Sequence, residues 1–245
     1  MRLDKFLSHA GFGSRKEVKQ LIRQRRVRVN DTLAKNPSQK ISPETDTVYV
    51  DDEPISYKEH YYYVLNKPSG YISATEDQYR PTVLDFFVGL PAFEKLFPVG
   101  RLDVDTEGLL IITTDGQLAH RLTHPKWNVE KEYYAIVEGD VSNIDFSKYE
   151  KEGLFLQKEN YKTKPFKVKI LSSSPEKSEI QITLTEGKYH IVKNIMEQLG
   201  HPVQYLRRTR VANLKLDENL KTGEFRELTE EEINDLKKTV NLLND

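Results

Sequence analysis

The stretch that decides the fold is Gly100-Arg101-Leu102-Asp103-Val104-Asp105-Thr106-Glu107-Gly108-Leu109-Leu110, which the apolar pair Ile111-Ile112 follows directly. In an extended segment alternate side chains face the same way, so Arg101 and Asp103 are predicted to share a face. A cation that close favours the ionised form of a carboxylate. The spacing alone is equally compatible with a surface Arg–Asp pair in front of a strand. The stretch therefore predicts a buried strand, preceded by a charged pair in which Asp103 is the first candidate functional residue.

The composition is that of a globular chain that is large for one domain. It has 245 residues, 37% of them hydrophobic and 31% charged, enough for one large core and a smaller one. No apolar run approaches the roughly 18 residues of a membrane span, and Asp4 and Lys5 stand where a signal peptide would be apolar. The absence of cysteine excludes disulfides and thiolate metal sites and agrees with a reducing compartment. We expect a cytoplasmic protein without membrane contact, and a monomer.

Positive charge is concentrated at the start of the chain. Residues 1–30 carry nine lysines and arginines against two acids, a net +7 in a chain whose formal net charge is −1. A solvated helix face is the plain alternative, but so many cations repel one another without an anionic partner. We therefore predict a nucleic-acid-binding module. Its candidate binding residues are Arg2, Lys5, Ser14, Arg15, Lys16, Lys19, Arg23, Arg26 and Arg28.

The first fifty residues predict two helices followed by two strands. Apolar residues at helical spacing indicate a helix over 3–10, which Gly11 ends. Ser14 and Glu17 form a capping box for a second helix. Two segments then alternate like strands, at 27–29 and 48–50.

The polar, proline-containing segment 51–60 is interpreted as a linker to a larger domain. Strands are predicted in that domain at 61–65, 109–113, 133–137, 166–170 and 180–184. Helices are predicted at 117–122, at 190–199, and after the capping box of Thr229 and Glu232. Because strands dominate and few of them alternate with helices, we expect an α+β fold with a mostly antiparallel mixed sheet.

Three more segments contain candidate functional residues. Asn66-Lys67-Pro68-Ser69-Gly70 consists of ordinary turn signals, so it is interpreted as a structural loop and Lys67 is given no chemical role. In the segment 131–134, alternation places Lys131 and Tyr133 on one face. Lys193 lies at the margin of an apolar helical stripe, where a long side chain can extend into a cleft.

No cofactor or metal is predicted. His120 and His124 have the i, i+4 spacing of metal ligands, but no third ligand follows at a useful interval. Neither a phosphate-binding loop nor a dinucleotide-binding fingerprint occurs. Residues 124–127 and 205–210 mix aromatic side chains with cations, a pattern equally compatible with stacking on unpaired bases and with supporting the fold.

Taken in order, these segments resemble the motifs of the pseudouridine synthases, and in particular the RsuA-type branch that modifies ribosomal RNA. The resemblance runs over nearly the whole chain. Residues 1–50 are similar to the αL RNA-binding module first described in a small-subunit ribosomal protein. The resemblance implies an RNA-binding domain with its linker at 1–58 and a catalytic domain at 59–245.

The resemblance also implies roles for four residues. Asp103 corresponds to the essential catalytic aspartate, and Lys193 to the basic residue that pairs with it. Arg101 and Lys193 together would keep that carboxylate charged and oriented. Tyr133 corresponds to the aromatic residue that lies against the target base, where its hydroxyl could relay the proton released from C5; a core tyrosine is the competing interpretation.

The implied function is the isomerisation of one uridine in 16S ribosomal RNA, of the position-516 type, by a flipped-base mechanism. The implied partner is ribosomal RNA or an assembling small subunit. Three alternatives remain: the sister branch that acts on large-subunit RNA, a non-catalytic RNA-binding assembly factor, and, more distantly, a hydrolase that releases uracil. Ile191 stands where the family often has glutamine and Asn194 where it often has another cation, departures that bear on RNA contacts.

Overall fold

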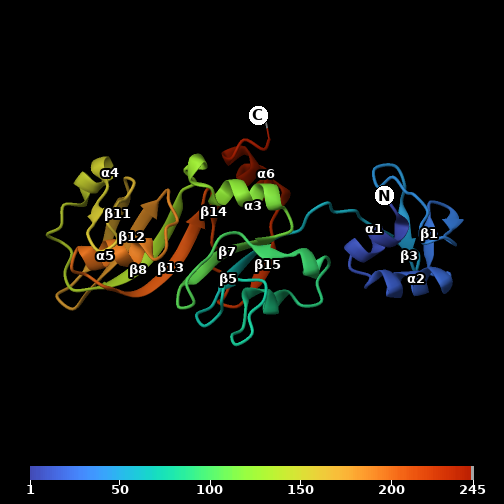
Figure 1. Cartoon of the computed structure of the whole chain (residues 1–245), viewed down its shortest axis with the longest axis horizontal. Helices are drawn as coiled ribbons and strands as arrows, with labels where there is room; N and C mark the ends of the chain where they lie inside the picture. The colour runs from blue at the N-terminus through green and yellow to red at the C-terminus, as the bar shows by residue number, and fades with distance from the viewer. Residues whose placement is uncertain (244–245) are drawn as a thin grey trace. The chain divides into compact units, whose positions relative to one another are not determined.

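The computed structural model describes residues 1–243, and the chain forms two compact units (Figure 1). The first unit comprises residues 1–61 together with 87–96, and the second comprises 62–86 together with the chain from residue 97 onward. Within the described residues, no helix is both long enough and apolar enough to cross a membrane.

The first unit contains two short helices and a four-stranded antiparallel sheet of order β2-β1-β3-β4. The helices are α1 (Leu3–His9) and α2 (Arg15–Arg23). The strands are β1 (Val27–Val29), β2 (Thr32–Leu33), β3 (Val48–Val50) and β4 (Glu53–Ile55). The apolar faces of helices and sheet form one core, whose fully buried members include Leu3, Leu7, Val18, Val27 and Val48.

The capping box predicted for α2 is confirmed. The Ser14 hydroxyl accepts a hydrogen bond from the Glu17 backbone amide at 3.3 Å, and the Glu17 carboxylate accepts one from the Ser14 amide at 2.7 Å. The linker prediction is wrong for residues 53–55, because they form β4 and pair with β3, Pro54 lying opposite Tyr49. Proline is tolerated there because β4 is an edge strand, with one side of its backbone unpaired.

In the second unit, nine strands of the described chain form one sheet, whose main path runs β11-β12-β8-β13-β7-β5-β15. Strand β14 pairs with β13, and β6 with β7. Every pairing is antiparallel except that of β13 with β7, so the predicted fold class is confirmed. The strands are β5 (Tyr62–Lys67), β6 (Phe97–Pro98), β7 (Glu107–Thr113), β8 (Lys131–Glu138), β11 (Lys167–Ser173), β12 (Lys177–Leu184), β13 (Val203–Val211), β14 (Leu214–Lys215) and β15 (Phe225–Glu227). A separate two-stranded sheet consists of β9 (Phe155–Leu156) and β10 (Tyr161–Lys162).

The helices cover the sheet at two places. Helix α3 contacts α6, and their apolar residues pack on strands β5 and β7, whereas α5 packs on β13 (Figure 1). The α-helices of this unit are α3 (Gly116–Thr123), α4 (Tyr149–Glu152), α5 (Ile191–Gln198) and α6 (Glu230–Thr239). Short 3-10 helices occur at Val83–Phe87, Phe93–Lys95, Pro125–Trp127 and Phe146–Lys148. The capping box predicted at Thr229 and Glu232 begins α6.

Strand β13 was not predicted, although it lies between β8 and β7 in the middle of the sheet. Two of its polar side chains, Tyr205 and Arg210, are satisfied within the fold. The Tyr205 hydroxyl donates to the Glu107 carboxylate at 2.7 Å, and Arg210 forms ion pairs with Glu130 and Glu132 at 3.1 and 3.4 Å. These contacts favour the fold-supporting interpretation of residues 205–210.

Candidate active site

The loop that carries Asp103 comes just before β7 and is anchored by the last residue of β5. Lys67 is fully buried, and its ammonium group donates hydrogen bonds to the backbone carbonyls of Asp103, Val104 and Thr106 at 3.1, 3.2 and 2.8 Å. It also donates to Pro68 O at 3.1 Å. One side chain therefore holds the backbone at the candidate aspartate and over the three residues after it.

The segment after β5 adds two more anchors to this loop. The Gly70 amide donates to the Val104 carbonyl at 2.8 Å. The Ser73 hydroxyl donates to the Leu102 carbonyl at 3.0 Å and accepts from the Leu102 amide at 3.1 Å. The predicted loop at 66–70 is wrong for Asn66 and Lys67, which end β5, and residues 68–70 form the loop. Together these residues fix the loop 102–106.

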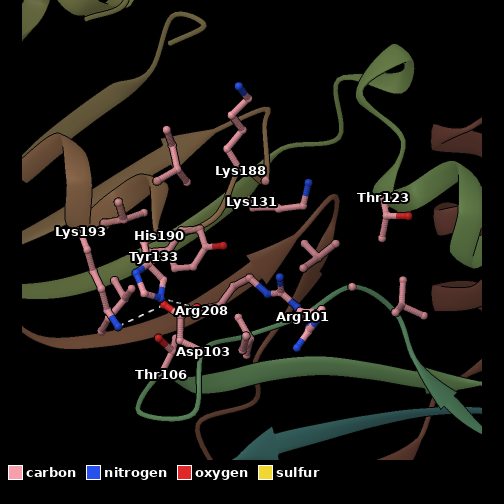
Figure 2. Close-up of a pocket in the computed structure, with 18 of the residues that line it drawn as sticks. Arg101, Asp103, Thr106, Thr123, Lys131, Tyr133, Lys188, His190, Lys193 and Arg208 are labelled. Atoms are coloured by element: carbon pink, nitrogen blue, oxygen red, sulfur yellow. Dashed lines mark ion pairs between the residues drawn. The ribbon is translucent and has the colours of Figure 1, made fainter. Parts of the chain in front are cut away.

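The Asp103 carboxylate has two cationic or potentially cationic partners, both at the start of α5. Its Oδ2 lies 3.1 Å from Lys193 Nζ, and its Oδ1 lies 3.3 Å from His190 Nε2 (Figure 2). The side chain remains 24% exposed, so its oxygens are reachable from the adjoining pocket. An oriented and accessible carboxylate is what nucleophilic attack or proton abstraction requires.

Lys193 bridges two carboxylates rather than one. Its ammonium group donates to Asp105 Oδ1 at 2.7 Å. This hydrogen bond lowers the pKa of Asp105. Partial burial lowers the pKa of Lys193, but the hydrogen bonds to Asp105 and Asp103 outweigh it, and the net direction is upward. Lys193 therefore stays protonated at neutral pH and supplies a fixed positive charge beside Asp103.

The residues around the start of α5 are held in a specific local geometry. His190 precedes the helix with a φ of +52°, a left-handed conformation, and its ring stacks on that of Tyr189 with centroids 3.6 Å apart. The Asn194 side-chain amide donates to the Tyr189 carbonyl at 3.3 Å, and Ile191 lines the pocket. Of the two departures from the family pattern, Asn194 thus makes a backbone contact and Ile191 forms part of the apolar wall of the pocket.

Three neighbouring strands, β8, β13 and β7, connect Tyr133 with the loop that carries Asp103. Tyr133 on β8 pairs with Arg208 on β13, and Arg208 pairs with Gly108 on β7. Tyr133 is 8% exposed and faces the pocket together with Lys131. Tyr134 faces the other way and donates a hydrogen bond to Glu179, as the alternation along β8 predicts.

These residues line one pocket, which encloses about 830 Å³ of space when its open mouth is included. Figure 2 shows Asp103, His190 and Lys193 together, with Tyr133 and Arg208 beside them and Lys131 and Arg101 further along the pocket. The walls between the polar groups are apolar; they consist of Val99, Leu102, Ile111, Leu122, Ile191, Val192, Leu206 and Val211.

The expected pairing of Arg101 with Asp103 is wrong. Both residues line the pocket, but within residues 1–243 Arg101 forms no ion pair with Asp103. The segment is not an extended strand at this point, since it is irregular at 101–103 and turns at 104–105, so the alternation argument does not apply. Lys193 provides the neighbouring cation instead, and His190 a second contact.

The predicted nucleic-acid-binding residues of the first unit fall into two groups. Three arginines are engaged within the unit: Arg2 pairs with Asp4, Arg26 with Asp51, and Arg28 with Asp31 and Asp52 at longer range, with its guanidinium over the Tyr49 ring. Ser14 serves as the cap of α2. In the described chain, the remaining cations have no ion-pair partner and are exposed; these are Lys5, Arg15, Lys16, Lys19 and Arg23.

The two spaced histidines lie together without forming a ligand set. The rings of His120 and His124 have centroids 5.3 Å apart. Among the residues that the structure describes, no group of three histidine, cysteine or acidic side chains is arranged to hold a metal ion.

Three side chains at the site had no assigned role in the sequence analysis. Lys67 acts through backbone groups 36 to 39 residues away, which no local pattern reveals. His190 is the first residue of the segment predicted as a helix at 190–199. Arg208 lies directly opposite Tyr133, and only the unpredicted strand β13 brings it there.

Comparison with known proteins agrees with this geometry. Residues 61–198 match the RNA pseudouridylate synthase family, and residues 1–55 match the S4 domain. The uncharacterized RNA pseudouridine synthase YtzG of Bacillus subtilis is 44% identical over 95% of this chain and 97% of its own length. Ribosomal small subunit pseudouridine synthase A of Escherichia coli strain K12 is 38% identical over 95% of this chain and 98% of its own length. A crystal structure of a pseudouridylate synthase superposes with a TM-score of 0.66 at 38% identity, covering 96% of this chain and 99% of that one.

The family match and the full-length relatives identify the class of protein as an RNA-modifying isomerase with an S4 domain in the N-terminal part of its sequence. The chain belongs to the RNA pseudouridylate synthase family, and its full-length relatives place it in the RsuA-like branch.

Proposed function

We propose that this enzyme isomerises one uridine of small-subunit ribosomal RNA to pseudouridine, of the 16S position-516 type, with Asp103 as the catalytic carboxylate. The observation that carries the proposal is the position of that carboxylate, which lies 3.1 Å from Lys193, is partly exposed, and lines the same pocket as Tyr133. Relatives named ribosomal small subunit pseudouridine synthase A match over 95–97% of the chain at 38–39% identity, which supports the choice of RNA. A ribosomal substrate is in keeping with action in the cytoplasm.

The reaction begins with extrusion of the target nucleotide from the folded RNA, at a cost of a few kcal/mol in lost stacking and pairing. The extruded uracil would stack on the ring of Tyr133, which is rigid because it sits in the middle of the sheet. The ribose then faces Asp103. Unpaired cations of α2, together with Lys5, would hold phosphates of the surrounding RNA.

In the chemical step the C1′–N1 bond breaks and its electron pair passes to the uracil. The Asp103 carboxylate either bonds to C1′ or takes a proton from the sugar. The uracil turns and C5 bonds to C1′ while the bond to Asp103 breaks, or the sugar regains its proton, and N1 takes up a proton. The C5 proton then leaves, and Tyr133 is placed to relay it. Lys193 and His190 keep the carboxylate oriented throughout. Because the base is retained, one carboxylate suffices where a glycoside hydrolase uses two.

The proposal is tested by mapping pseudouridines in both ribosomal RNAs of a strain from which this gene has been deleted. The expected result is the loss of one pseudouridine from the small-subunit RNA and its return when the wild-type gene is restored. Loss from the large-subunit RNA instead would assign the chain to the sister specificity. If neither RNA loses a modification, the enzyme does not act on ribosomal RNA, and a role in ribosome assembly becomes the better account.

A further inference from the structure

The pocket contains more positive charge than its one carboxylate can balance. Among the described residues that line it, five are lysines or arginines and the single acid is Asp103, which Lys193 and His190 already engage. Four of the cations have no acidic partner within ion-pair distance in the described chain; Arg101 and Lys188 are exposed, whereas Lys131 and Arg208 are not. Buried charges of one sign are unfavourable unless a ligand balances them.

Lys131 is the more unusual of the two. It is partly buried, and its ammonium group has a single long contact, with the Val129 carbonyl at 3.5 Å. Burial lowers its pKa to about 8, and the charges of Arg208 and Lys164 act in the same direction. Lys164 itself is occupied by Pro125 O and Asn128 Oδ1, at 3.2 and 2.8 Å.

Arg208 is 4% exposed, and its guanidinium is fixed from one side only. Its Nε donates to the Leu109 carbonyl at 2.9 Å, while its two terminal nitrogens have no hydrogen-bond partner among the described residues. Strand pairing puts Arg208 directly opposite Tyr133, and Lys131 is on the same face of β8 two residues before Tyr133. Both cations therefore border the place proposed for the uracil ring.

We propose that Lys131 and Arg208 bind the carbonyl oxygens of the extruded uracil and stabilise the negative charge that the base acquires when its bond to the ribose breaks. This proposal rests on the proposed function. The electron pair of the C1′–N1 bond spreads over N1, O2 and O4 of the detached base. Asp103 balances the sugar, by bonding to C1′ or by taking a proton from it. When C5 bonds to C1′, that bond or proton transfer is reversed, the C5 proton leaves, and N1 takes one up.

The surroundings favour a base over an RNA phosphate as the bound group. Ile111, Leu122 and Val211 line the same pocket, and apolar walls suit a flat ring better than a hydrated phosphate. The base is also the group that must be retained while detached, because its loss would make the reaction a hydrolysis. Preorganised donors aimed at a developing charge contribute most in such a water-poor site.

The experiment uses the full-length enzyme and an RNA fragment containing the uridine identified by mapping. The fragment is synthesised with uridine, 2-thiouridine or 4-thiouridine at that position, because sulfur accepts a weaker hydrogen bond than oxygen. Single-turnover rates and RNA dissociation constants are measured for the wild type, Lys131→Met and Lys131→Gln. Lys169→Met, on the exposed edge strand β11, is the control. The glutamine variant serves if the methionine variant does not fold.

With uridine, we expect the Lys131 variants to slow the single-turnover rate by about a hundredfold, with a dissociation constant within about threefold of the wild type. With one of the two thio-substituted RNAs, the factor by which the same variants slow the single-turnover rate should be at least tenfold smaller, since the contact with Lys131 is already weakened there. Equal slowing on all three RNAs would overturn the proposal. So would a weaker RNA affinity with an unchanged single-turnover rate, which would identify a phosphate contact instead. If the wild type itself converts no RNA, the proposed function fails, and that result is distinct from either of these.

Discussion

At the scale of single residues, the site depends on a buried lysine that does not touch the pocket. Lys67 binds three carbonyls of the loop that presents Asp103, so it determines where the carboxylate lies without taking part in the reaction. The sequence around it reads only as a turn. Its role depends on backbone groups brought in by β7, so it could not be predicted from local pattern.

The burial of Lys67 has a measurable consequence for stability. Its pKa is lowered to about 8, chiefly by burial and against the pull of Asp105, Asp103 and Glu107, whereas in the unfolded chain it is about 10.4. At pH values between these two pKa values, the unfolded chain binds more protons than the folded chain. The contribution of Lys67 to the unfolding free energy therefore rises with pH. From about pH 7.5 to 9.5, the unfolding free energy of the wild type should rise by about 2 kcal/mol relative to that of Lys67→Met. Denaturant titrations at both pH values measure this, and a difference that does not change with pH would contradict it.

At the scale of elements, local signals predicted the helix starts and several strands. The capping boxes at Ser14 and Thr229 could be predicted from the sequence, because a capping box involves two residues only three positions apart. Strand β12 was predictable because Ile180, Ile182 and Leu184 alternate with polar residues in the sequence. In the structure these three are buried, and the residues between them are more exposed. Strand β13 was not predicted, since it is rich in polar residues and the partners of some of them lie on other strands, as Glu107 does for Tyr205.

Strands β7 and β13 approach each other closely where β7 begins. Gly108 has a φ of +107°, and a Cβ there would collide with the backbone of Arg208, its parallel partner on β13. We expect Gly108→Ala to lower the unfolding free energy by about 3 kcal/mol or more, because neither backbone can move without shifting the sheet. Gly116→Ala is the matched control, since nothing lies within 4 Å of the position of its Cβ. It begins α3, where alanine should be neutral or stabilising by up to about 1 kcal/mol. Similar losses in both variants would refute the argument.

At the scale of the whole molecule, the charge asymmetry separates the residues expected to bind RNA from those expected to carry out the reaction. The basic cluster of residues 1–30 belongs to the first unit, and the pocket belongs to the second. The sequence predicted the basic module correctly as an RNA-binding S4 domain, but it could not tell which cations are free. Arg26 and Arg28 face acids that lie more than twenty residues further on, Asp51 and Asp52.

This distinction predicts different salt dependences. Replacing Arg15, Lys16 and Lys19 by glutamine should lower the slope of log binding constant against log salt concentration by about 2 to 3, because each free cation releases counterions from RNA. Replacing Arg26 and Arg28 should change the slope less per charge, because these arginines already face carboxylates. Filter-binding titrations over a range of salt concentrations measure both slopes. Equal changes per charge would show that the ion pairs open when RNA binds.

The central claim is that one carboxylate performs the chemistry, and its most direct test removes that charge with little change of shape. Tritium release from C5-labelled small-subunit RNA is measured for the wild type and for Asp103→Asn, together with RNA affinity. We expect tritium release to fall by at least about a thousandfold, while the dissociation constant changes by less than about threefold, because the cations that hold RNA are untouched. Tritium release at the wild-type rate by Asp103→Asn would contradict the account.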